Sequence, residues 1–164
     1  MNETSVVGGF FGLEPHLNRD DLQGKYEFLG RLNASWNTLD YILRLALKRI
    51  RGVSINSEEA DKIFRQPHGT LIDKLLSEYS GNQDVVEEIN KVGRSRDGSE
   101  FYGQRNKYFH AVWAIDSTGQ EVYQRVGGND WRTSVNFEIS EIMNLISDIE
   151  RTAFKIEQLT KSEN

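Results

Sequence analysis

The chain has 164 residues, of which 37% are hydrophobic, 27% charged and 10% aromatic, a composition typical of a folded domain and unlike that of a disordered segment. It contains no cysteine, which excludes disulfides and thiolate metal sites and suits a reducing compartment. The formal net charge of -5 argues against a broad basic surface for nonspecific nucleic-acid binding. We therefore expect a cytoplasmic protein in which any contact with RNA is local.

The length and the residue pattern predict one domain. Residues 1-18 contain Gly8, Gly9, Gly12 and Pro15 between short apolar pieces, so we expect an irregular N-terminal lead-in. Residues 19-164 are expected to form a single helical domain. No apolar run approaches the ~20 residues that a membrane span requires, so no membrane partner is expected.

The first predicted helix covers about residues 20-50. Its apolar residues recur at steps of three and four, the spacing of one helical face: Leu29, Leu32, Trp36, Leu39, Leu43, Leu47 and Ile50. The basic pair Lys48 and Arg49 followed by Gly52 is typical of a helix C-terminus.

Three helical patterns follow. Ser57, followed by two glutamates, predicts an N-cap for a short helix that ends near Pro67. A second pattern ends at Gly81 and contains Leu71, Ile72, Leu75, Leu76 and Tyr79. A third contains Val85, Val86, Ile89 and Val92, and its continuation holds three glycines, each of which costs about 1 kcal/mol in a helix interior. We expect a bend or break near Asp97-Gly98.

The pattern then changes to short strands. Residues 111-126 predict two strands joined by a turn at 116-119, and residues 131-137 a third strand after a turn at 127-130. A final helical stripe begins at Ile139 and contains Ile142, Leu145, Ile146, Ile149, Ala153, Ile156 and Leu159. The sequence thus predicts a mainly α fold, an antiparallel four- to five-helix bundle with a small β-hairpin insertion before the last helix.

The residues most suited to chemistry are Arg105, Asn106 and His110. An imidazole can move a proton at neutral pH, and a guanidinium can stabilise charge that develops on a phosphoryl group. If residues 102-113 form a helix, these three share one broad face with three aromatic residues, Tyr102, Phe109 and Trp113, and Lys107 lies on the opposite face. The Asn106 amide would then lie close enough to orient the His110 ring.

The order R-N-x-x-x-H on a late helix of a small helical bundle resembles the signature of the HEPN superfamily. Members typically carry an arginine, a polar residue directly after it, and a histidine four to six positions on. The first helix, with Trp36, Leu39 and Asp40, and the segment 110-113 also resemble bacterial members. The resemblance covers about residues 26-160.

This resemblance implies a homodimer in which two copies of the motif form one composite site for metal-independent endoribonuclease action, with no cofactor. It implies that His110 assists attack by the RNA 2′-hydroxyl or protonates the 5′ leaving oxygen. Arg105 would stabilise the phosphoryl transition state, and Asn106 would orient His110 or contact phosphate. The product would be a 2′,3′-cyclic phosphate. Many members act in toxin-antitoxin pairs, phage defence or RNA processing, which implies an antitoxin or other regulatory protein as a partner.

Several interpretations stay open at this stage. Tyr102, Phe109 and Trp113, together with Lys107, are candidates for RNA binding or for a dimer interface, and we favour the interface for the aromatic residues. Asp40 is either a partner of Arg105 or an exposed acid. His16 and His68 each lack a second ligand at a suitable spacing, so no metal site is predicted.

Two functions remain: a homodimeric ribonuclease, or a noncatalytic HEPN-like module that binds RNA or a partner protein.

Overall fold

The computed structural model describes the backbone of residues 14-15, 23-96, 98-115, 121-125, 134-136 and 139-161, and the side chains of residues 26-96, 98-110 and 139-161. Most of the predicted lead-in (1-18) and the predicted turns at 116-119 and 127-130 lie outside the described residues. Within the ranges given, none of the helices combines the length and apolar character needed to cross a membrane.

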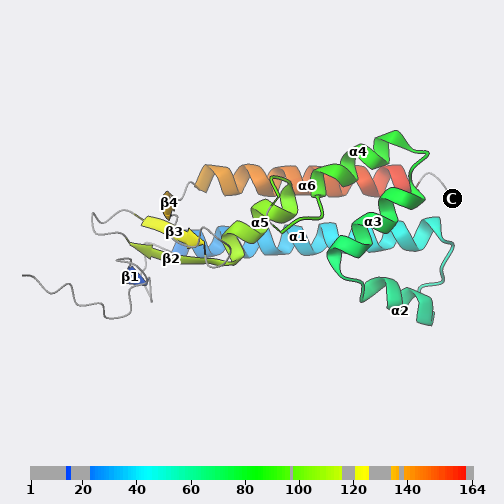
Figure 1. Cartoon of the computed structure of the whole chain (residues 1–164), viewed down its shortest axis with the longest axis horizontal. Coiled ribbons are helices and arrows are strands. Elements are labelled where there is room, and N and C mark those ends of the chain that lie inside the picture. Colours follow the sequence, from blue (N-terminus) through cyan, green and yellow to red (C-terminus); the bar gives the residue numbers. More distant parts are fainter. Residues whose placement is uncertain are drawn as a thin grey trace, which may run out of the picture.

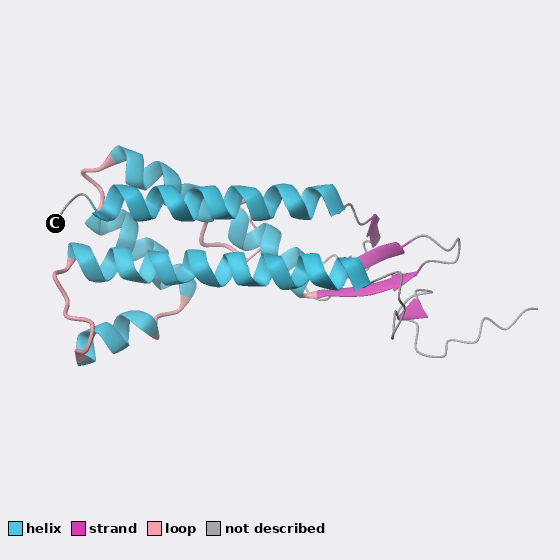
Figure 2. Cartoon of the chain, turned by 180° about the vertical axis from the view of Figure 1, so that it is seen from behind, coloured by secondary structure: helices cyan, strands magenta, loops and turns pink. Residues whose placement is uncertain are grey.

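Two long helices, α1 (Gln23–Ile50) and α6 (Ile139–Lys161), lie side by side along the length of the bundle (Figures 1 and 2). Their apolar stripes meet in one core, as the periodicity predicts. Fully buried side chains from the two helices include Leu32, Leu39, Leu43, Leu47, Ile142, Ile149 and Ile156. The prediction of a mainly helical bundle is confirmed.

The helices α1 and α6 run in the same direction. Ser35, in the first half of α1, donates to Glu150 over 2.7 Å. Arg49, in the last turn of α1, donates to Thr160 near the end of α6 over 3.2 Å. The expected antiparallel arrangement is therefore wrong for this central pair. The chain between them, residues 51-138, is long enough to return to the starting end, whereas antiparallel neighbours usually follow from short loops. Figure 1 shows α4 and α5 carrying the chain back.

Three shorter helices follow α1: α2 (Glu58–Phe64), α3 (His68–Glu78) and α4 (Gln83–Val92). The helix α3 runs in the same direction as α1, since His68 lies near Asp40 and Glu78 pairs with Arg51. Ser57 caps α2 by accepting from the Ala60 amide over 3.1 Å, so the predicted N-cap is confirmed. Pro67 stands at the start of α3, and Gly93 ends α4 with a φ of 73°, a conformation that favours glycine.

The helix α5 (Phe101–Phe109) is short and separate from α4. The helical structure is interrupted between Gly93 and Glu100, the region in which the sequence predicts a bend or break. Asp97 itself lies outside the described residues. The helix expected over 102-113 ends at Phe109, with His110 as its C-cap, and the next residue begins a strand. The helical face assumed for Trp113 is therefore wrong, because the run of β-forming residues after His110 pairs with another strand.

Four short strands lie at the end of the bundle where α1 begins (Figure 1). They are β1 (Glu14–Pro15), β2 (Ala111–Ile115), β3 (Glu121–Arg125) and β4 (Ser134–Asn136), in the order β1-β2-β3-β4. Each neighbouring pair is antiparallel, and the register of β2 and β3 places Trp113 opposite Tyr123. The arrangement means that α5 leads from the helical bundle directly into the strands.

Candidate functional site

Arg105 lies on the side of α5 that faces α1. Its guanidinium carbon is 4.3 Å from the centroid of the Phe109 ring and 5.8 Å from that of Trp36. Both distances are within the range of a cation-π interaction. Burial lowers the pKa of Arg105 from its usual value, while Tyr102 and the Asp40 carboxylate act in the opposite direction. A guanidinium starts from so high a pKa that the side chain stays a cation at neutral pH.

A set of stacked rings continues from Trp36 into the bundle. The rings of Trp36 and Tyr102 stack with their centroids 5.6 Å apart and their planes at 25°. The imidazole of His68 lies 4.1 Å from the Tyr102 ring and 5.3 Å from Trp36. Tyr102 thus packs against side chains of its own chain, and α5 is attached to α1 and α3 through these rings.

His68 is a site residue that the sequence pattern did not reveal. It is the first residue of α3, its side chain is only 10% exposed, and its Nε2 lies 2.9 Å from the Gly93 carbonyl oxygen. Because a carbonyl can only accept, Nε2 carries the hydrogen. Its Nδ1 lies 3.9 Å from Asp40 Oδ1. Residues 40, 68 and 93 come from different elements, so no local spacing could have indicated this contact.

Asp40 is paired with Arg44 one turn further along α1. The Arg44 Nε–Asp40 Oδ2 distance is 2.7 Å, and Nη2 donates to Oδ1 over 3.2 Å. Burial raises the pKa of Asp40, but the contacts with His68 and Arg44 outweigh it and the net pKa is lowered. Asp40 therefore acts on Arg105 through its charge, while its hydrogen bonds go to Arg44.

Asn106 is only 5% exposed and is bound to its sequence neighbour. Arg105 Nη1 donates to Asn106 Oδ1 over 3.0 Å. Within the described part of the chain, Asn106 Nδ2 and Arg105 Nε are buried and have no hydrogen-bond partner. The amide was expected to orient the His110 ring, but its oxygen holds the guanidinium instead.

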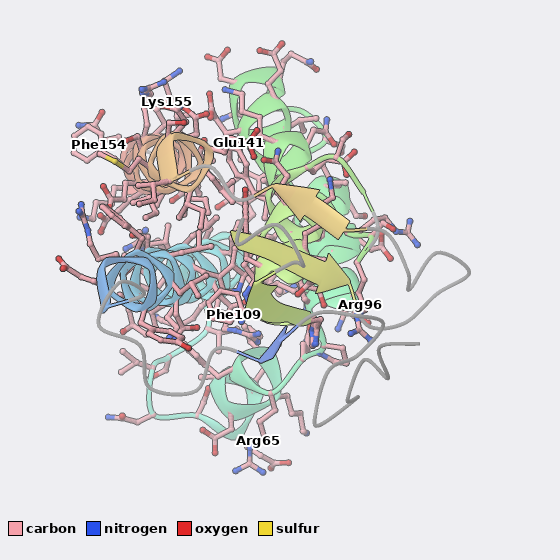
Figure 3. All side chains as sticks on the ribbon, turned by 90° about the vertical axis from the view of Figure 1, so that its left-hand side faces the viewer. Arg65, Arg96, Phe109, Glu141, Phe154 and Lys155 are labelled. Carbon is pink, nitrogen blue, oxygen red and sulfur yellow. The ribbon has the colours of Figure 1, made fainter. Side chains whose placement is uncertain are left out.

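His110 caps α5, and its side chain is exposed. Its backbone amide donates to the Asn106 carbonyl over 3.0 Å, which continues the helical hydrogen bonding by one residue. Its ring Nε2 lies 3.3 Å from Nη2 of Arg96, a residue of the loop between α4 and α5. In Figure 3, Phe109 lies on the α1 side of the motif and Arg96 on the side away from α1.

The remaining predicted site residues lie apart from this centre. Lys107 lines a polar cavity of about 490 Å³ between α5 and α6, which also contains Glu141 and Asp148. Trp113 is on β2, and its side chain is outside the described residues. The structure therefore brings Arg105, Asn106, Phe109 and Tyr102 together and leaves Lys107 on another face.

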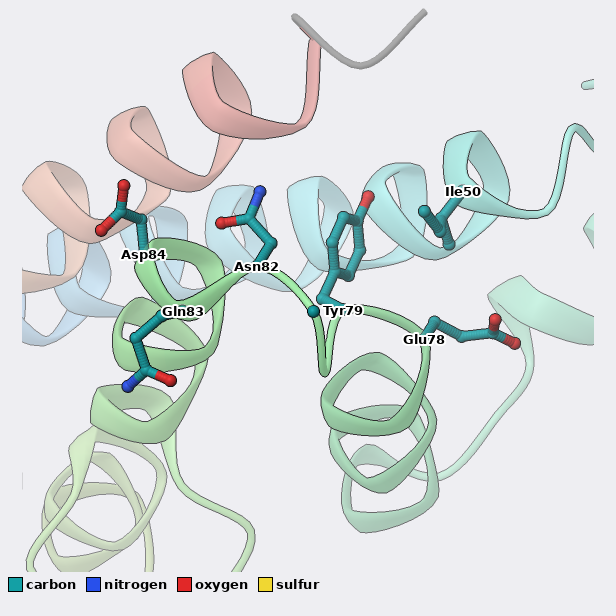
Figure 4. Close-up of a pocket in the computed structure, with 7 residues that line it drawn as sticks. Ile50, Glu78, Tyr79, Asn82, Gln83 and Asp84 are labelled. Atoms are coloured by element: carbon teal, nitrogen blue, oxygen red, sulfur yellow. The ribbon is translucent and has the colours of Figure 1, made fainter.

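Other features of the described residues offer less for phosphate chemistry. A cavity of about 530 Å³ at the α3–α4 turn is lined by Glu78 and Asp84 with no basic side chain (Figure 4). Its acids repel phosphate. Across the described part of the chain, no cluster of three or more His, Asp and Glu side chains is placed to hold a metal ion.

Comparison with protein-family models, with curated proteins and with solved structures finds no match to this chain. The class of protein defined by the fold is a helical bundle with a basic motif at the junction of α5 and β2. The function of this chain is therefore inferred from the geometry at this junction.

Proposed function

We propose that this chain is a HEPN-like endoribonuclease that acts as a cytoplasmic homodimer without a metal ion. The observation that carries the proposal is the exposed His110 imidazole at the end of α5, which lies beside the Arg96 cation and one turn from the Arg105–Asn106 pair. A proton-transfer group next to a permanent cation is suited to RNA transesterification.

In the proposed reaction, His110 removes the proton from an RNA 2′-hydroxyl as the 2′-oxygen forms a bond to phosphorus. The bond from phosphorus to the 5′-oxygen breaks, and that oxygen takes a proton from water. The products are a 2′,3′-cyclic phosphate and a free 5′-hydroxyl. Arg105 stabilises the negative charge on the phosphoryl oxygens, and Asn106 fixes the direction of its guanidinium through the 3.0 Å bond.

The dimer is part of the proposal. Two copies of α5 meet so that each protomer supplies one His110, with Phe109 and Trp113 at the contact and Lys107 available to RNA. The β-hairpin insertion before α6 then lies next to this interface. An antitoxin or other regulatory protein controls the dimer in a toxin or phage-defence role.

A noncatalytic module is the second candidate, and a different observation favours it. Arg105 contacts the Phe109 and Trp36 rings and Asn106 is 5% exposed, so both side chains also attach α5 to α1. A residue that serves packing alone is expected to affect folding when it is removed, whereas loss of a catalytic group spares it. In this second case the same surface binds RNA or a partner protein without cleaving it.

The test is cleavage of a mixed RNA pool in EDTA by wild type and His110→Ala, with His16→Ala as the control that removes the same group outside the motif. Sizing and thermal melting first establish that the three proteins have the same oligomeric state and stability. Cleavage that is lost only in His110→Ala supports the nuclease. Equal cleavage by all three refutes the mechanism, and no cleavage by any supports the noncatalytic module.

A further inference from the structure

The loop between α4 and α5 carries two exposed arginines with different partners. Arg94 Nη1 lies 3.0 Å from Asp73 Oδ1, and both side chains are at least half exposed. Arg96 Nη2 lies 3.3 Å from Nε2 of His110, fourteen residues further along the chain. These two arginines, two positions apart, thus differ in their partner: Arg94 pairs with Asp73, and Arg96 contacts the imidazole of His110.

The contact distinguishes between the two tautomers of the ring. An arginine side chain has five N–H donors and no acceptor, and its guanidinium stays charged in proteins. A contact between Nη2 and Nε2 is therefore a hydrogen bond only when Nε2 carries a lone pair. The hydrogen bond therefore forms with the tautomer of His110 that carries its proton on Nδ1. That is the form in which Nε2 can accept a proton from a substrate hydroxyl.

We propose that Arg96 is a catalytic residue of this site, one that holds His110 in the Nδ1–H tautomer and binds the phosphate that is cleaved. The proposal rests on the proposed ribonuclease function. When RNA binds, the phosphate takes the Nη2 donor of Arg96, which frees the Nε2 lone pair. The 2′-hydroxyl proton then moves to Nε2, the 2′-oxygen bonds to phosphorus, and the 5′-oxygen leaves and is protonated by water. Arg96 remains on the phosphate and balances its growing charge.

The loop that carries Arg96 is held at both of its ends. Before Arg96, the Gly93 carbonyl accepts from His68 Nε2 over 2.9 Å. After it, Gln104 Nε2 donates to the Ser99 carbonyl over 2.6 Å. The buried Gly103 also lets the Gly98 backbone pack directly on α5. The position of Arg96 relative to His110 is thus built by contacts with α3 and α5, as expected for a residue that must meet a particular ring.

The experiment compares Arg96→Ala with Arg94→Ala, a matched change of the same charge in the same loop that does not touch His110. Initial rates of cleavage of the mixed RNA pool in EDTA are measured over a range of RNA concentrations. We expect Arg96→Ala to lower the rate at saturating RNA by about 10- to 100-fold, because one donor to developing phosphoryl charge is lost from an exposed site. Arg94→Ala should stay within about twofold of wild type. Arg96→Lys should restore part of the rate, since lysine also donates without accepting.

Nitrogen-15 NMR of His110 gives a readout that does not depend on cleavage. In the uncharged His110 ring we expect an unprotonated Nε2 in wild type and in Arg94→Ala. In Arg96→Ala we expect a shift toward the tautomer that carries its proton on Nε2. If His110→Ala abolishes cleavage while Arg96→Ala behaves like Arg94→Ala, the role of Arg96 is refuted and the nuclease stands. If wild type does not cleave, the proposed function fails and the catalytic role of Arg96 fails with it. A wild-type ring protonated on Nε2 overturns the tautomer assignment under any cleavage result.

Discussion

Gly103→Ala tests the contact that places the Arg96 loop against α5. Gly103 is buried in α5, and a Cβ at this position would collide with the carbonyl of Gly98 and come within 2.7 Å of the Gly98 nitrogen. The atoms in the way belong to the backbone, so no side-chain rotation relieves the collision. Either the loop or the helix must move.

The expected magnitude follows from two opposing terms. Alanine is better than glycine in a helix interior by about 1 kcal/mol. Overpacking costs about 1-3 kcal/mol, and a rigid backbone neighbour favours the upper end. We therefore expect a net loss of about 2 kcal/mol in the free energy of unfolding. For a chain of this size that corresponds to a Tm lower by about 4-8 °C.

Gly30→Ala is the matched control. Gly30 is an exposed residue of α1, and a Cβ there would have nothing within 4 Å. The same substitution should raise Tm by about 2-4 °C, because only the helix-propensity gain remains. Thermal unfolding followed by circular dichroism at equal protein concentration measures both shifts. If Gly103→Ala stabilises the chain as much as Gly30→Ala, the close packing of Gly98 on α5 is refuted.

Three further predictions concern other parts of the molecule. Burial raises the pKa of Glu88, but hydrogen bonds from Lys91 and Lys155 outweigh this effect, and the net pKa is lowered. The contribution of ionised Glu88 to the free energy of unfolding is therefore present above the unfolded-state pKa and disappears as pH falls through the folded-state pKa. Glu88→Gln should thus be less stable than wild type at pH 7 in urea titrations, with a gap that narrows in acid; a gap independent of pH contradicts this. Ser57→Ala should cost about 0.5-2 kcal/mol through loss of the α2 cap, and an unchanged urea midpoint would show that the cap contributes nothing. Arg105→Lys should lower both Tm and RNA cleavage, because an ammonium does not reproduce a planar guanidinium against aromatic rings, and full retention of both argues against that contact.

Local patterns predict much of the helical part of the fold. The three-and-four spacing of leucines identifies the buried face of α1, where Leu32, Leu39 and Leu43 are fully buried. Ser57 marks the start of α2, since an N-cap depends only on the next few residues. The last helix begins at Ile139, the first residue of its apolar stripe.

Local patterns do not distinguish a helix from a strand where the two tendencies compete. The sequence pattern predicts an end of α5 that is too late, because the aromatic spacing through Trp113 fits a helix as well as a strand. Pairing with β3 decides between the two. The direction of α6 relative to α1 also lies beyond local patterns. An apolar stripe indicates which face is buried, but it carries no information on the direction of the helix that covers it.

The candidate site divides in the same way. The sequence alone determines that Arg105, Asn106 and His110 share a short segment, because adjacent positions on one helix lie together in any fold that forms it. Only the tertiary structure determines that Arg105 lies against Trp36 and that Arg96 reaches His110. The physical reason is that these contacts join separate elements, whose approach depends on the packing of the whole core and on the glycines that let the backbones meet.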